Sequence, residues 1–285
     1  MSELHTKAIR IHLTWGYWRP EKTDKAITRQ TNVSLGVQGD RGHYDKLLFS
    51  PEYMRGLREH TSKTKAYYYA HTLPWEDKVS RLISTAKVED VTIELNRAIN
   101  KYEEILRDTV GDDAKYEQAV YDQRLYLTSA WQKGDYPHRE EFMAKYYGAL
   151  SILPLVSSSD IRCELSDALR KQIADSIERD TTERFQLAMA DCWKRLYEPV
   201  RKMADVLMDA KQSFRDTLVS NVLEICDVMP ELNILDDTAL SVMTERIKMT
   251  LQVDPDVLRD SNVSREEYAK KADELAAILS KMGVN

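Results

Sequence analysis

The side chains of this chain that could do chemistry are its histidines and its paired carboxylates. His12 stands on the polar side of a strand-like stretch, where a carboxylate opposite it would make it a general base. His60 and His71 lie eleven residues apart, which is roughly 16 Å along one helix and too far for one metal ion. Acidic neighbours such as Glu103 and Glu104 fit a solvated helix face. None of the common catalytic, nucleotide-binding or zinc motifs occurs, so we predict no enzyme and no catalytic, cofactor or metal residue.

A second set of side chains could bind a partner, because charge and aromatic rings are unevenly distributed. Residues 1–85 hold 14 Lys and Arg against 9 Asp and Glu, a balance of +5, whereas residues 86–285 have a balance of −11. Positive charge with aromatic rings suits a surface that faces phosphate or a nucleobase, although a small β-rich unit also gathers aromatic residues for its core. The candidate partner-binding residues are Arg10, His12, Trp18, Arg19, Arg55, Arg58, Lys63, Lys65, Tyr67, Tyr68, Tyr69 and Trp75.

A small β element at the N-terminus must position the first of these residues. Apolar side chains alternate at Ile9, Ile11, Leu13 and Trp15, which is typical of a strand with one buried face. The opposite face would carry Arg10, His12 and Thr14. The same alternation at Val33, Leu35 and Val37 predicts an antiparallel element of two or three strands that packs on helices.

A helix is predicted to follow this β element and to carry most of the other candidates. Ser50 as N-cap and Pro51 at the first helical position indicate its start, and Pro74 stops it after about His71. Consecutive residues of a helix point about 100° apart, so Tyr67–Tyr69 cannot share one face. At least one of these tyrosines is expected to reach solvent or a partner.

From Val88 nearly to the end, the pattern predicts helices. We expect them over 88–110, 114–131 and 139–153, followed by one apolar stripe from Leu165 to Val222 that Pro199 kinks or interrupts and Pro230 ends. That stripe is too long for a compact globule, so we expect an antiparallel hairpin in the manner of a coiled coil, with residues 88–130 as its partner. Two short helices then complete the chain, the last with Ser264 and Glu267 as a capping box and Gly283 as a C-cap.

The predicted fold class is therefore mainly α, a long antiparallel helical hairpin or bundle with a small N-terminal antiparallel β element. The change in composition near residue 86 predicts a basic, aromatic-rich domain over 1–85, made of a β-hairpin plus a helix, and an acidic elongated helical domain over 86–285. Cys163, Cys192 and Cys226 form no CxxC pair and are expected to be small buried side chains in a reducing compartment. With no apolar leader and no run long enough for a bilayer, we expect a cytoplasmic protein without membrane contact.

The front of the chain resembles a family of uncharacterised phage and bacterial proteins known by a domain-of-unknown-function label. The resemblance rests on the strand with Trp15-Gly16, the stretches "VSLGV" and "KLL", and the helix exit marked by Arg55, Arg58, Thr72, Pro74 and Trp75, and it covers residues 5 to 200. Some members of that family are encoded beside MoxR-type ATPases and von Willebrand A-type proteins. The resemblance thus implies a MoxR-type ATPase as a partner and carries over no catalytic residue.

Two classes of function agree with these observations. A non-enzymatic, phage-type assembly or adaptor protein would use the apolar stripes and opposed charges to self-associate or to dock a partner such as an ATPase, in the host cytoplasm if it is phage-encoded. The alternative is a protein that binds single-stranded nucleic acid. The candidate arginines and lysines, together with Lys22, would bind phosphates, and the candidate aromatic rings would stack on bases. The acidic remainder of the chain counts against duplex binding.

Overall fold

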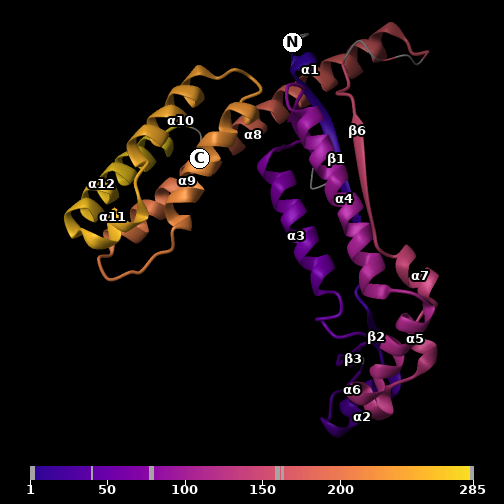
Figure 1. The fold of residues 1–285 in the computed structure, drawn as a ribbon. Helices are drawn as coiled ribbons and strands as arrows, with labels where there is room; N and C mark the ends of the chain where they lie inside the picture. The colour runs from indigo at the N-terminus through magenta and orange to yellow at the C-terminus, as the bar shows by residue number, and fades with distance from the viewer. Residues whose placement is uncertain (1–3, 40, 77–79, 158–160, 162–163, 283–285) are drawn as a thin grey trace. The chain divides into compact units, whose positions relative to one another are not determined.

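The computed structural model of the chain describes residues 4–39, 41–76, 80–157, 161 and 164–282 and is mainly helical, with a small sheet (Figure 1). It divides into two compact units. The first unit comprises residues 1–12, 67–92 and 151–285, and the second comprises 13–66 and 93–150. Residue 86, where the composition changes, lies inside the first unit.

The helices are α1 (Leu4–Lys7), α2 (Lys25–Ser34), α3 (Arg55–Ala70), α4 (Val88–Val110), α5 (Asp113–Asp122), α6 (Arg124–Leu127), α7 (Arg139–Ala144), α8 (Asp167–Met208), α9 (Thr217–Leu232), α10 (Thr238–Leu251), α11 (Pro255–Asp260) and α12 (Asn262–Leu279). The strands are β1 (Ala8–Gly16), β2 (Glu21–Thr23), β3 (Asp45–Leu47), β4 (Leu73–Pro74), β5 (Arg81–Ser84) and β6 (Tyr147–Leu153), and two short 3-10 turns follow α6. The predicted fold class is confirmed.

The predicted strand at residues 9–16 exists, but its pairing differs from the prediction. β1 pairs antiparallel with β5, from Ala8 opposite Ser84 to Ile11 opposite Arg81, and the sheet order is β4-β5-β1-β6. The predicted strand at residues 33–37 is wrong, because Val33 and Ser34 form the end of α2 and a turn follows at Leu35 and Gly36. The Asp24 side chain caps α2 by accepting hydrogen bonds from the backbone N–H groups of Ala26 and Ile27, both at 3.1 Å.

Two predicted helices, over 51–71 and 88–110, are present. α3 begins at Arg55, later than predicted, because bonds between residues three apart, such as Tyr53 N–H to the Ser50 carbonyl at 3.1 Å, close a turn before it. α4 buries the predicted stripe, including Leu95 and Tyr102, and ends before Gly111, whose φ of +70° suits glycine.

The helices predicted over 114–131 and 139–153 are shorter than expected. α5 ends at Asp122 and is followed by α6 and the 3-10 turns, and α7 ends at Ala144, before β6. Gly148 is a weak helix former, and in β6 its missing side chain leaves room for the Trp15 ring. A Cβ atom at Gly148 would lie 2.6 Å from that ring. The apolar run that we predicted as helix is therefore a strand.

The core of the second unit is aromatic. Phe49 stacks on Tyr53 with ring centroids 4.7 Å apart and meets Phe142 edge-on at 5.3 Å. Trp15 lies 4.7 Å from the ring of Tyr102. Burial raises the pKa of Tyr53 and of Tyr102 to about 12, so both hydroxyls stay neutral at physiological pH.

The core of the first unit lies between α8, α9, α10 and α12, which pack side by side (Figure 1). The partner that we predicted for the long helix, residues 88–130, is wrong, because α8 packs mainly on α12 and α9. α8 continues through Pro199, and α9 ends at Leu232, just beyond Pro230. Among the described helices, none combines the length and the apolar character needed to cross a bilayer.

Three further details of the first unit bear on the predictions. Cys192 and Cys226 are buried, and burial raises the pKa of each thiol to about 12, as expected for structural cysteines. The predicted capping box is wrong, because Ser261 caps α12 and accepts from the N–H of Ser264 at 3.1 Å. Cys163 and Gly283 lie outside the described residues.

The long apolar stripe breaks after Met208 because an arginine from α12 binds the end of α8. Arg265 is buried, and its guanidinium donates to the carbonyls of Val206 (2.9 Å), Leu207 (3.2 Å), Asp209 (2.6 Å) and Gln212 (2.7 Å). These groups belong to the last turn of α8 and the loop after it, where carbonyls lack helical partners. Arg201 of α8 pairs with Asp273 of α12 at 2.6 Å, so the two helices run antiparallel.

Replacement of this arginine tests its structural role. We expect Arg265→Met to lower the free energy of unfolding by roughly 2 to 4 kcal/mol, because buried carbonyls lose their donors. Arg179→Met, on an exposed side of α8, is the matched control and should change stability by less than about 0.5 kcal/mol. Urea unfolding followed by circular dichroism measures both; equal stability of the two variants would contradict the capping role.

Candidate interaction surfaces

The sequence-predicted site residues do not fall in one unit. Arg10, His12, Tyr67–Tyr69 and Trp75 belong to the first unit, whereas Trp18, Arg19, Arg55, Arg58, Lys63 and Lys65 belong to the second.

The helix exit at Thr72–Trp75 is a structural feature of the first unit. Thr72, Leu73 and Trp75 are buried. Arg195 of α8 donates to the carbonyls of Tyr69 (2.8 Å), Ala70 (3.2 Å) and Thr72 (2.9 Å), and Arg81 of β5 also donates to the Thr72 carbonyl at 2.7 Å. These guanidinium groups satisfy the end of α3.

The prediction that the Trp75 ring stacks on a base of a bound partner is therefore wrong. Its ring lies 5.2 Å from that of Phe185, edge-on, in the core of the first unit, and its carbonyl accepts a hydrogen bond from Arg184. A buried ring of this kind has no face left for a base.

The three tyrosines have three different environments, as expected. Tyr68 is buried and donates its hydroxyl to the carbonyl of Ile11 at 2.8 Å, so it is not available to a partner. Tyr69 is 46% exposed, but the Arg81 guanidinium lies 4.7 Å from the centre of its ring. Tyr67 is half-buried, with its ring 4.4 Å from that of His71. Tyr69 is thus the tyrosine of this run that reaches solvent most.

The polar face of β1 is half-covered within the first unit. Arg10 forms an ion pair with Glu76 at 3.0 Å, and only a fifth of its side chain is exposed. His12 is also half-buried. The charge of Arg10 is therefore already balanced.

In the second unit, most of the predicted basic residues also have internal contacts. Arg19 pairs with Glu21 at 2.6 Å, Arg55 lies 3.7 Å from Glu59, and Arg58 donates to the carbonyl of Pro51 at 2.6 Å. Lys63 and Lys65 are exposed, with no ion pair to a described residue. Trp18 is half-buried, edge-on to Phe142 at 5.8 Å, with the Lys145 ammonium 4.9 Å from its ring centre.

The sequence analysis did not predict a buried network of charged side chains in the second unit, which joins β2 and β3 to Asp24 and Asp135. Lys46 of β3 is buried, and its ammonium lies 2.7 Å from a carboxylate oxygen of Asp135 and 3.1 Å from one of Asp24. It also donates to the carbonyl of Ala130 at 2.6 Å. Lys22 reaches the other oxygen of Asp135 at 2.6 Å. Because Asp24 caps α2, the network also fixes the start of that helix.

The network shifts the pKa values of Lys46 and Asp135 in the directions expected for neighbours of opposite charge. Burial would lower the pKa of Lys46, but the hydrogen bonds to Asp135 and Asp24 outweigh it and raise that pKa. Burial would likewise raise the pKa of Asp135, but hydrogen bonds from Lys22 and Lys46 lower it. Lys46 and Asp135 are thus held in their charged forms, and the network is a structural one.

A basic cavity lies next to α2 in the second unit. Its volume is about 670 Å³, and its described lining holds three basic or titratable side chains among polar and small ones: Lys25, Arg29, His43, Thr23, Thr28, Asn32, Val33, Val37 and Gly39. Lys25, Arg29 and His43 are exposed and form no ion pair with the residues that the structure describes. The candidate residues predicted from the sequence did not include these three, although Lys25 and Arg29 carry positive charge.

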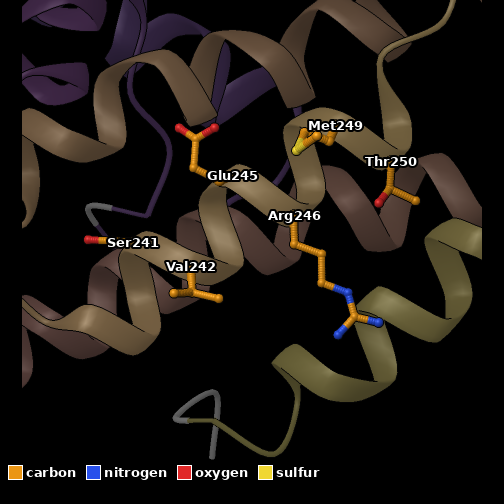
Figure 2. Close-up of a pocket in the computed structure, with 6 residues that line it drawn as sticks. All are labelled: Ser241, Val242, Glu245, Arg246, Met249 and Thr250. Carbon is orange, nitrogen blue, oxygen red and sulfur yellow. The ribbon is translucent and has the colours of Figure 1, made fainter.

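A second, mainly apolar surface lies on the outer side of α10 in the first unit. Leu240, Met243, Ile247 and Leu251 bury the inner side of this helix, whereas Val242 is 62% and Met249 81% exposed. A shallow pocket of about 540 Å³ lies along this surface, lined by Ser241, Val242, Glu245, Arg246, Met249 and Thr250 (Figure 2). Neither Glu245 nor Arg246 is ion-paired within the described part of the chain.

Comparison with known protein families, with curated proteins and with solved structures gives no match. Nowhere in the described part of the chain do three or more His, Cys, Asp or Glu side chains group as ligands for a metal ion. The α10 outer face and the α2 cavity both carry exposed charged side chains that form no ion pair with a described residue.

Removal of the central lysine tests the charge network. We expect Lys46→Met to lower the free energy of unfolding by about 3 kcal/mol, because it leaves two carboxylates without their shared cation. Lys22→Met, which removes a half-exposed lysine from the same Asp135, should cost less than about 1 kcal/mol. Urea unfolding of the two variants side by side gives this comparison.

The pH dependence provides the control. Because the folded-state pKa of Asp135 is lowered, its contribution is present above the unfolded carboxyl pKa of about 4 and is lost as the pH falls through the folded value. The stability difference between wild type and Lys46→Met should therefore shrink below about pH 4. A difference that grows on acidification would show that the network does not stabilise the fold.

Proposed function

We propose that this chain is a non-enzymatic assembly or adaptor protein that binds other protein chains, its own copies included. The observation that carries the proposal is the α10 outer face, where two large apolar side chains are well exposed beside unpaired charges of opposite sign. Exposed apolar contact area rimmed by polar groups marks protein interaction sites. The buried inner side of the same helix keeps that face rigid.

The resemblance to the phage and bacterial family adds one heterologous partner to this proposal. A MoxR-type ATPase is the partner it implies, and the cytoplasm, of the host where the chain is phage-encoded, is the compartment in which we propose that the two meet. An adaptor of this kind needs no catalytic group of its own, since the ATPase would supply the chemistry.

Self-association is the first test of the proposal. Sedimentation velocity over a concentration series should show wild type passing from monomer to a larger species, because the exposed apolar side chains become buried between chains. Val242→Ser with Met249→Ser should remain monomeric over the same range. Leu187→Ser, at an exposed apolar position of α8, is the matched control and should behave as wild type. A wild type that stays monomeric at every concentration would contradict self-association.

The second candidate function, binding of single-stranded nucleic acid, is favoured by the α2 cavity. Lys25 and Arg29 offer positive charge that no described carboxylate neutralises by an ion pair. The described lining contains no aromatic ring on which a base could stack, so we place this function second.

Fluorescence anisotropy with a labelled single-stranded oligonucleotide tests this second function. If it holds, wild type binds with an affinity that falls as salt rises, and Lys25→Glu with Arg29→Glu abolishes the signal. Lys171→Glu with Arg179→Glu on α8 makes the same change of charge in the first unit and should leave binding intact. No binding by wild type at low salt would exclude the function.

A further inference from the structure

The outer face of α10 carries a pattern that is symmetric about its own midline. Val242 and Met249 are seven residues apart, so they lie nearly in line along the helix, two turns from each other. Glu245 and Arg246 lie midway between them in height, roughly 50° to either side of that line. Figure 2 shows this arrangement, with Glu245 and Arg246 on opposite flanks of the line from Val242 to Met249.

We propose that two copies of the chain bind each other through this face about a two-fold axis parallel to α10, an inference that rests on the self-association proposed above. The two α10 helices then run parallel. Val242 packs on Val242 of the second copy and Met249 on its Met249. On each flank, Glu245 of one copy faces Arg246 of the other, so the dimer contains two ion pairs across the axis.

The charges select the parallel arrangement over the antiparallel one. In an antiparallel pair, the two-fold axis lies across the helices and keeps each flank on its own side. Glu245 would then meet Glu245 of the second copy, and Arg246 would meet Arg246. Like charges in contact are unfavourable, whereas the parallel pair brings opposite charges together on both flanks.

The second copy is the occupant that fits this face best, because the surface complements itself in charge and in its line of apolar side chains. An isologous interface requires that each residue meet a suitable residue of the same surface, and this face satisfies that condition at its apolar line and on both flanks. The contact involves one helix face, which is small for a permanent interface, so we expect a dimer that dissociates on dilution.

Reversal of the charges tests the arrangement in the full-length protein. Glu245→Arg or Arg246→Glu alone places like charges on both flanks and should weaken the dimer about tenfold or more, as measured by sedimentation equilibrium. The double variant, Glu245→Arg with Arg246→Glu, exchanges the flanks and should restore the wild-type dissociation constant. An equimolar mixture of the two single variants should form heterodimers, because opposite charges meet again.

The matched control uses an adjacent acid–base pair on another helix. Glu178 and Arg179 are exposed on α8 of the same unit, and Glu178→Arg or Arg179→Glu should leave the dimer unchanged. This control separates a change of net charge from a change at the proposed interface.

Disulfide trapping tests the direction of the helices. In a Cys163→Ser background, where Cys192 and Cys226 are buried, Val242→Cys alone should form a covalent dimer on mild oxidation, and so should Met249→Cys alone. An antiparallel pair would place residue 242 opposite residue 249 and would cross-link only when the two variants are mixed. That result would overturn the parallel arrangement.

The outcomes distinguish this inference from the function on which it rests. If wild type dimerises but neither the charge variants nor the single cysteines respond, another surface makes the dimer and the α10 arrangement is wrong. If wild type is monomeric at all concentrations, both the arrangement and the self-association fail. Loss of dimer in the single charge variants, with recovery in the double variant, supports both.

Discussion

The first unit depends on arginines that satisfy the carbonyls at the ends of helices. A helix leaves its last carbonyl groups without partners, and a buried helix end must find donors elsewhere. Arg265 of α12 supplies them to α8, and Arg195 of α8 supplies them to α3. One guanidinium carries five N–H donors, so a single side chain can satisfy several carbonyls. Because each arginine belongs to a different helix from the one it binds, the same contact ends one element and attaches another.

The periodic patterns of apolar residues correctly predicted the helices and strands whose own sequence determines which face is buried. The stripe from Val91 to Leu106 buries one face of α4, and alternation from Ile9 to Trp15 marks β1, because each pattern matches the period of its own structure. The prediction of mainly helical structure follows from the same patterns. At residues 33–37 the alternation was misleading: Asp24 caps the start of α2, and that helix extends to Ser34.

The remainder depends on contacts between residues far apart in sequence. No feature near Met208 announces that Arg265 will end α8 there, and nothing near β1 names β5 as its neighbour. Candidate site residues show the same limit. Arg10 and Trp75 have the residue types of a binding surface. Glu76 neutralises Arg10, however, and Trp75 is buried against Phe185 in the core of the first unit. Exposure is a property of the folded chain, so composition could indicate a basic front but not which of its side chains remain free.

The charged side chains of the α10 outer face differ from those inside the two units, because they form no ion pair within the described residues. Arg195, Arg201 and Lys46 each have a carboxylate within hydrogen-bonding distance, so a partner would have to displace an existing contact to use them. Glu245 and Arg246 have no such contact to give up among the described residues, and the apolar side chains next to them gain from losing water. Binding at the α10 face therefore costs little desolvation of paired charge and little rearrangement, because the inner side of the helix is already fixed by the core. This low cost supports the proposal of an interaction surface on α10, whereas Arg10, Arg19 and Lys46 in the more basic front of the chain would each have to give up an ion pair.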